Sequence, residues 1–121
     1  MPLVPGVVFW HHETAIGQHR WIVLSNATPE DKVLVVVVTT YTHKSHQETT
    51  CVLGSTDYSE LDHDSWIRYD RARLFDVDFV NRQTMYKSLQ ADALTKVLLG
   101  ARDSVRIEMG HQQVLMDQGL I

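Results

Sequence analysis

An unbroken apolar run at residues 33–38, closed by Thr39 and Thr40, restricts the possible folds of this chain more than any other segment. The run consists of five valines and one leucine, and short runs of β-branched residues favour strands. A strand that is apolar at every position must be covered on both faces. The run is also far shorter than the roughly 20 residues that a membrane-spanning helix requires. It therefore predicts a central strand in a β-rich protein without membrane association.

Shorter segments predict the rest of the fold. Further strands are expected at 6–10, 19–24, 50–53, 65–69 and 72–76, with polar connections at 11–18, 25–32, 41–49 and 54–64. Ser88 is placed to cap a helix over about 89–101, whose apolar residues recur at helical spacing. Residues 105–109 alternate and predict an extra strand before a tail, whereas 79–87 have no clear pattern. Five to seven strands with one C-terminal helix favour a small, mainly β antiparallel barrel, formed by residues 1–121 as a single domain.

Composition indicates which binding partners and which cellular compartment suit this chain. The chain has 121 residues and a net charge of −4, so nucleic-acid binding would need a local basic patch. Residues 66–87 provide one, with five basic and three acidic side chains. A single cysteine, Cys51, excludes an internal disulfide, and the first residues lack the features of a secretory signal. A cytoplasmic protein is therefore expected.

The seven histidines raise the question of a metal site. Zinc sites need three or four convergent ligands, and no recognisable ligand spacing occurs beside the single cysteine. We therefore expect neither a metal nor another cofactor. His12 or His19 remains a candidate proton-transfer group, and Cys51 is expected in the core.

The most highly charged stretch, 64–76, holds three arginines and three aspartates. If this stretch is extended, Trp66, Arg68 and Asp70 point to one face, because side chains alternate along a strand. A fixed guanidinium beside a fixed carboxylate suits phosphodiester chemistry. The same two groups could equally form a surface ion pair that contributes less than about 1 kcal/mol.

The order of three motifs resembles the Kid/PemK/MazF family of bacterial toxins. Gly6-Val7-Val8-Phe9-Trp10 matches the glycine and apolar strand with which the family opens, and Arg20-Trp21-Ile22-Val23-Leu24-Ser25-Asn26 matches its next strand. The segment Ser65-Trp66-Ile67-Arg68-Tyr69-Asp70-Arg71-Ala72-Arg73 matches its most specific motif. The chain departs from the family pattern at Trp21 and Val38, where proline is usual.

The resemblance implies an SH3-like barrel that cleaves single-stranded RNA without metal, acts as a homodimer and is silenced by an antitoxin protein. It assigns catalytic roles to Arg68 and Asp70, with a supporting hydroxyl from Thr39 or Thr40. It further implies RNA-binding roles for Arg20, Arg73, Trp66 and His19.

Two other functions remain open at this stage, because one fold hosts several activities. The chain could be a non-catalytic binding module on the same SH3-like barrel, or a protein poison of the gyrase-inhibiting kind. An enzyme predicts that Arg68, Asp70 and a threonine hydroxyl converge in a concave site. A binding module predicts that these side chains are dispersed.

Overall fold

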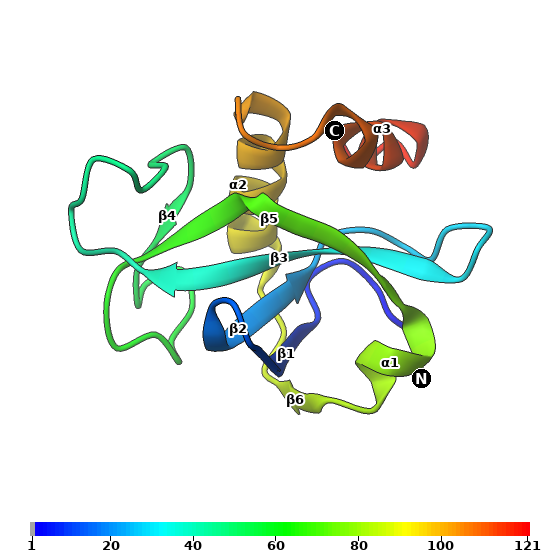
Figure 1. Ribbon diagram of the computed structural model, residues 1–121, viewed down its shortest axis with the longest axis horizontal. Coiled ribbons are helices and arrows are strands. Elements are labelled where there is room, and N and C mark those ends of the chain that lie inside the picture. Colours follow the sequence, from blue (N-terminus) through cyan, green and yellow to red (C-terminus); the bar gives the residue numbers. More distant parts are fainter. Residues whose placement is uncertain (1) are drawn as a thin grey trace.

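The computed structural model describes residues 2–121, which form a mainly β fold (Figure 1). The strands are β1 (Val8–Glu13), β2 (Gly17–Val23), β3 (Lys32–Thr40), β4 (Val52–Leu53), β5 (Ser65–Asp76) and β6 (Thr84–Tyr86). The helices are α1 (Val77–Asn81), α2 (Ala91–Asp103) and α3 (Met109–Asp117). The six strands form one antiparallel sheet in the order β4-β5-β3-β2-β1-β6. The mainly β, antiparallel fold is therefore confirmed, but the described residues contain three helices rather than one.

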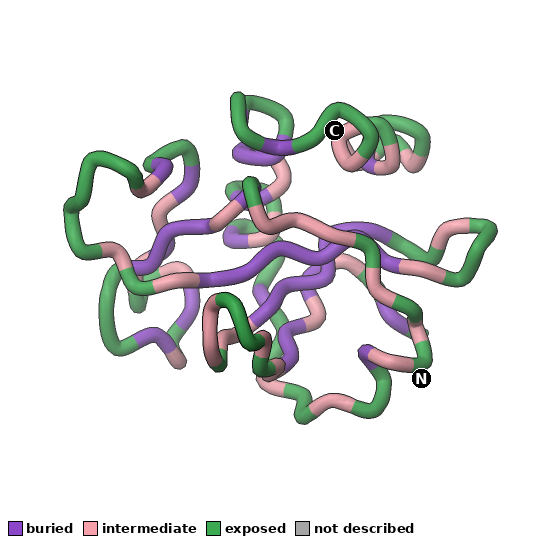
Figure 2. The backbone as a smooth tube through the Cα atoms, viewed as in Figure 1, coloured by how far each residue is buried: buried purple, intermediate pink, exposed green. Residues whose placement is uncertain are grey.

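The valine run forms the centre of this sheet, as predicted. β3 pairs with β2 on one side and with β5 on the other. Its residues 33–37 are fully buried, and Figure 2 shows burial along most of the strand. Leu34, Val36 and Val38 enter the core on one face of the sheet, and the residues between them enter the core on the other face.

Helices α2 and α3 lie on the same side of the sheet (Figure 1). Ala93, Val97 and Ala101 of α2 and Leu115 of α3 join the core on this face. Val97 and Leu115 are fully buried, which contributes about 1.5–3 kcal/mol each. We call this helix-covered side the convex face.

The opposite, concave face curls on itself. Phe9 of β1 and Phe75 of β5 are separated by two strands in the sheet, yet their ring centroids are 6.3 Å apart. On the same face, a guanidinium nitrogen (Nη1) of Arg73 lies 2.6 Å from the Glu13 Oε1 atom. Contacts between strands that are not neighbours require the sheet to bend toward this face, which produces a half-barrel.

β5 is one bent strand, where the sequence predicts two. Val37 lies opposite Arg68 and Val35 lies opposite Arg73, so five steps along β5 match two steps along β3. The surplus residues form a bulge, which bends the strand without ending it. The interruption in the alternating pattern is therefore a bulge and not a turn.

The polar connection predicted at 11–18 is wrong. β1 continues to Glu13 and β2 begins at Gly17, so only residues 14–16 link the two strands. Gly17 has a φ of 85°, which glycine adopts without strain. His11 and His12 both pair with β2, His11 at a half-buried position and His12 at an exposed one, and such positions tolerate polar side chains.

Two predictions at the C-terminal end are also wrong. α2 begins after Gln90 and has no side-chain cap, so Ser88 does not cap it. The strand expected at 105–109 is a turn that leads into α3. The Ser104 hydroxyl accepts hydrogen bonds from the Arg106 and Ile107 N–H groups at 3.1 and 3.3 Å, which closes the turn. No helix among residues 2–121 is long and apolar enough to cross a bilayer.

Candidate functional site

Arg68 and Asp70 lie together on β5, as the alternation predicts. Arg68 donates two hydrogen bonds to the Asp70 carboxylate, from Nε at 3.2 Å and from Nη2 at 2.7 Å. The two side chains are 22% and 32% exposed, so the pair lies at the surface. Trp66 is only 2% exposed, and the Arg68 guanidinium lies 5.1 Å from its ring centroid. A base therefore cannot stack on Trp66 unless Arg68 moves.

The ion pair also limits what Asp70 can do chemically. Burial opposes ionisation of its carboxyl group, but the hydrogen bonds and charge of Arg68, with smaller help from the Asp70 backbone and Arg71, outweigh that effect. The pKa of Asp70 is therefore held below its usual value. A carboxylate with a lowered pKa is a weaker general base.

The two threonines at the end of β3 lie on opposite faces of the sheet. Thr39 is opposite Trp66, and so shares the concave face with Arg68. Thr40 is opposite Ser65 and points to the convex face. The four residues predicted to be catalytic are therefore divided between the two faces.

A polar cluster of Arg73, Glu13 and His11 lies at the rim of the concave face. It pairs with Glu13, whose side chain is 13% exposed, and its guanidinium lies 5.8 Å from the Trp21 ring centroid. His11 Nε2 lies 3.8 Å from the Glu13 Oε1 atom. Glu13 and His11 were not among the functional residues predicted from the sequence, because both were expected in a loop. The contact of Glu13 in β1 with Arg73 in β5 depends on the curl of the sheet, which the sequence does not indicate.

His11 makes stability depend on pH. Burial among aromatic rings lowers its pKa from the ordinary value of 6.5, assisted by Arg73 and His12 and opposed by Glu13. The unfolded chain then binds the proton more readily than the folded chain, so the free energy of unfolding should fall as the pH drops below about 6.5. In His11→Phe, urea titrations between pH 8 and pH 5 should show a shallower fall than in the wild type. An unchanged pH dependence would contradict this assignment.

A pocket of about 220 Å³ lies on the convex face at the Thr40 end of β3. Its lining residues are Trp10, Gln18, His19, Arg20, Val38, Thr40, Leu61 and Ser65. Cross-strand pairing of Arg20 with both Trp10 and Val38 places its side chain in the middle of this face. The pocket thus brings together three residues predicted from the sequence, namely Arg20, His19 and Thr40.

Among residues 2–121, Arg20 has no acidic partner, in contrast to Arg68 and Arg73. Its guanidinium lies 5.9 Å from the Trp10 ring centroid and 5.3 Å from the Tyr86 ring centroid. Across residues 2–121, no carboxylate forms an ion pair with it, and its Nε is buried without a hydrogen-bond partner. A buried donor without an acceptor is costly, and the half-buried guanidinium lines a pocket in which it could bind an anion such as a phosphate.

Two histidines lie close to this pocket. His19 contributes to its lining, but it pairs with His11 and so directs its side chain to the concave face, where its Nε2 donates to the Ile16 carbonyl oxygen at 2.6 Å. His12 is two residues from Trp10 on β1 and therefore shares the convex face. Imidazole is the commonest general base in enzymes, so His12 could receive a proton on the face that Arg20 occupies.

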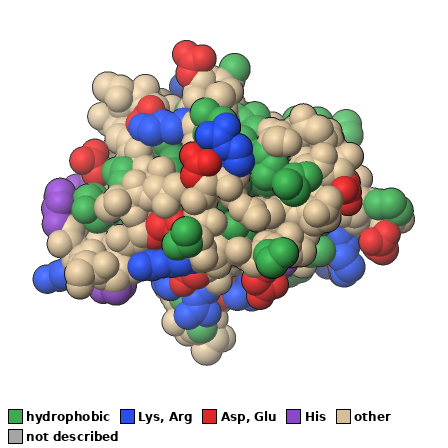
Figure 3. All heavy atoms as spheres, turned by 90° about the horizontal axis from the view of Figure 1, so that it is seen from above, with side chains coloured by type: hydrophobic (Ala, Val, Ile, Leu, Met, Phe, Trp, Pro, Cys, Tyr) green, Lys and Arg blue, Asp and Glu red, His purple; other side chains and the backbone are tan. Residues whose placement is uncertain are grey.

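The surface seen from the side of α2 and α3 has mixed charge. Figure 3 shows lysine and arginine side chains next to acidic ones on this side, rather than a continuous basic surface. Any phosphate recognition must therefore depend on a local site. No cluster of three or more His, Cys, Asp or Glu residues that could hold a metal ion occurs in the described part of the chain.

Comparison with known proteins assigns no function to this chain, so a functional assignment must rest on the geometry of the candidate site. No protein-family model matches this chain, and no curated protein matches its sequence.

Proposed function

We propose that this protein is a metal-independent endoribonuclease of the Kid/PemK/MazF kind, the toxin of a toxin–antitoxin pair. In this proposal it acts in the cytoplasm as a homodimer on single-stranded RNA, and an antitoxin protein silences it. The unpaired Arg20 guanidinium, in a pocket that also contains the Thr40 and Ser65 side chains, is the observation that supports the proposal most. The antiparallel half-barrel is compatible with the SH3-like barrel of that family.

The proposed chemistry uses the RNA's own nucleophile. A base takes the proton of a 2′-hydroxyl, the oxygen attacks the adjacent phosphorus, and the bond from phosphorus to the 5′-oxygen breaks. The leaving oxygen takes a proton from water, so the products carry a 2′,3′-cyclic phosphate and a 5′-hydroxyl. Arg20 would hold the phosphate oxygens on which negative charge grows, and His12, on the same face of the sheet, would accept the first proton.

This proposal moves the reaction away from Arg68 and Asp70. The donors of Arg68 that face Asp70 are already occupied, and the lowered pKa of Asp70 weakens it as a base. The pair would instead hold the bulged part of β5 in place. Arg73, bound to Glu13, would likewise stabilise the curl of the sheet rather than contact RNA.

The test is incubation of the purified protein with a single-stranded RNA in the presence of EDTA, followed by analysis of the product ends. We expect fragments with 2′,3′-cyclic phosphate ends, and no cleavage of the same sequence made with 2′-O-methyl groups. Binding of both RNAs without cleavage of either would favour the non-catalytic binding module. The absence of both binding and cleavage would refute an RNA-directed function.

A further inference from the structure

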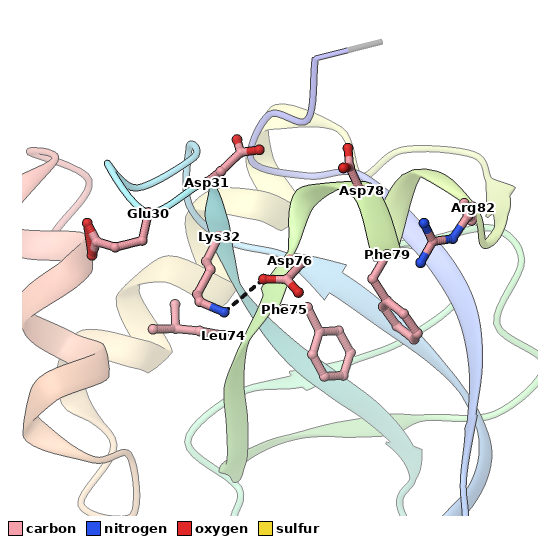
Figure 4. A pocket seen from close by; sticks show the side chains of 9 residues that line it. All are labelled: Glu30, Asp31, Lys32, Leu74, Phe75, Asp76, Asp78, Phe79 and Arg82. Carbon is pink, nitrogen blue, oxygen red and sulfur yellow. Dashed lines mark hydrogen bonds and ion pairs between the residues drawn. The ribbon is translucent and has the colours of Figure 1, made fainter.

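A second, larger pocket of about 660 Å³ lies at the opposite end of β3 (Figure 4). It is lined by the start of β3, the end of β5 and helix α1. Lys32 belongs to this pocket and Thr40 to the pocket around Arg20, and eight strand steps separate them by about 26 Å. The two sites can therefore be tested independently.

The pocket surrounds a free edge of the sheet. β4 pairs only with Ser65 and Trp66, so among the described residues β5 has no strand neighbour on that side beyond the first few positions. Leu74 and Phe75 leave β5 in opposite directions, and both line the pocket (Figure 4). A pocket that contacts side chains from both faces of one strand must extend around the edge of that strand.

The backbone at Leu74 points into this free edge. Leu34, the partner of Leu74 on β3, directs its own N–H and C=O toward Ser25 and Leu24 on the β2 side. In an antiparallel ladder the residue opposite such a position directs its backbone groups away from the shared strand. The N–H and C=O of Leu74 are therefore available to another strand.

The side chains around this edge define the chemistry of a ligand. Leu74, Phe75 and Phe79 provide apolar surface, and Leu74 is 36% exposed. Four carboxylates surround them, from Glu30, Asp31, Asp76 and Asp78, against the two cations Lys32 and Arg82. Lys32 is already paired with Asp76 at 2.8 Å, so the rim remains net acidic.

We propose that this edge binds an extended basic segment of a partner protein, which adds a strand to β5. The partner's backbone bonds to Leu74, an apolar side chain contacts Leu74 and the two phenylalanines, and its lysine or arginine residues meet the acidic rim. This is strand addition, in which main-chain hydrogen bonds supply affinity and alternate side chains supply specificity. A long free edge with an apolar side chain is otherwise an aggregation risk.

The probe is a capped, fluorescently labelled hexapeptide of alternating valine and lysine. We expect saturable binding by fluorescence anisotropy, and NMR amide shifts concentrated at residues 72–79. The same peptide with glutamate in place of lysine should bind at least about tenfold more weakly, because it repels the rim. No saturation up to about 1 mM peptide, or amide shifts centred elsewhere, would overturn the proposal.

Two variants test the backbone and the charge separately. Leu74→Pro removes the outward N–H without removing a bond to β3, and should weaken binding about tenfold relative to Leu74→Ala, which removes the same side chain but keeps the N–H. Glu30→Lys should weaken binding of the peptide, because it removes an acidic side chain from the rim. The control Asp62→Lys changes an acidic residue in another loop and should leave binding unchanged. If the wild type is instead a dimer that Leu74→Pro converts to a monomer, the edge belongs to a second copy of this chain, and the proposal is wrong.

Discussion

Arg20→Ala should lower the rate of RNA cleavage by about 100-fold to 1,000-fold. Removing a preorganised donor from a site of developing negative charge has an effect of this size in other enzymes. Arg20 has no acidic partner within the part of the chain that the structure describes, so the loss should come directly from the missing contact with the phosphate. Single-turnover cleavage of a labelled RNA measures it, with the thermal midpoint of each variant as the check on folding.

Three control variants separate the possible sites. Arg20→Lys keeps the charge but loses the forked donor geometry, and should recover only part of the rate. Arg68→Ala and Asp70→Asn should retain most of the activity, because their side chains hold each other on the concave face. If Arg68→Ala abolishes cleavage and Arg20→Ala does not, the catalytic centre lies on β5 and our placement is wrong.

Gly100→Ala should destabilise the fold by about 3 kcal/mol, equivalent to a fall in the thermal midpoint of about 10 °C. An added Cβ would overlap the Tyr69 hydroxyl, and would lie 2.9 Å from Tyr69 Cζ and 3.0 Å from Cys51 Cβ. Tyr69 is 1% exposed and its hydroxyl donates to the Val97 carbonyl oxygen at 2.7 Å, so the ring cannot turn aside. This overlap outweighs the roughly 1 kcal/mol that alanine normally gains over glycine in a helix.

The matched control is Gly110→Ala in α3, where an added Cβ meets no atom within 4 Å. That variant should be as stable as the wild type or slightly more stable. Combining Gly100→Ala with Tyr69→Phe should recover part of the loss, because the worst contact disappears. Denaturant titration compares all four proteins. A Gly100→Ala variant with wild-type stability would show that α2 does not pack so closely on β5.

Prediction from the sequence succeeded for segments whose side chains repeat one simple pattern. The valine run of β3 was recognised because every position is apolar, and α2 because its buried residues recur at helical spacing. It failed where polar residues lie inside regular structure, as at His11 and His12 in β1. It also failed at 105–109, where the alternation of Val105 and Ile107 belongs to a turn held by Ser104.

The candidate site was anticipated only in part. Alternation along one strand was enough to place Arg68 beside Asp70, because both belong to the same segment. Alternation also separates Thr39 from Thr40, but the register of three strands decides which of the two shares a pocket with Arg20. Such a register depends on how distant segments pair, which no local pattern records.

Local sequence patterns are enough to predict a β-rich core around residues 33–38 and a guanidinium next to a carboxylate on one strand. Which of the charged side chains find a partner depends on the three-dimensional fold. The bulge in β5 and the curl of the sheet bring Arg73 to Glu13, while Arg20 lies between two rings and has no counterion among residues 2–121. Local patterns follow from the backbone geometry of each strand, whereas the pairing of charges follows from the path of the whole sheet.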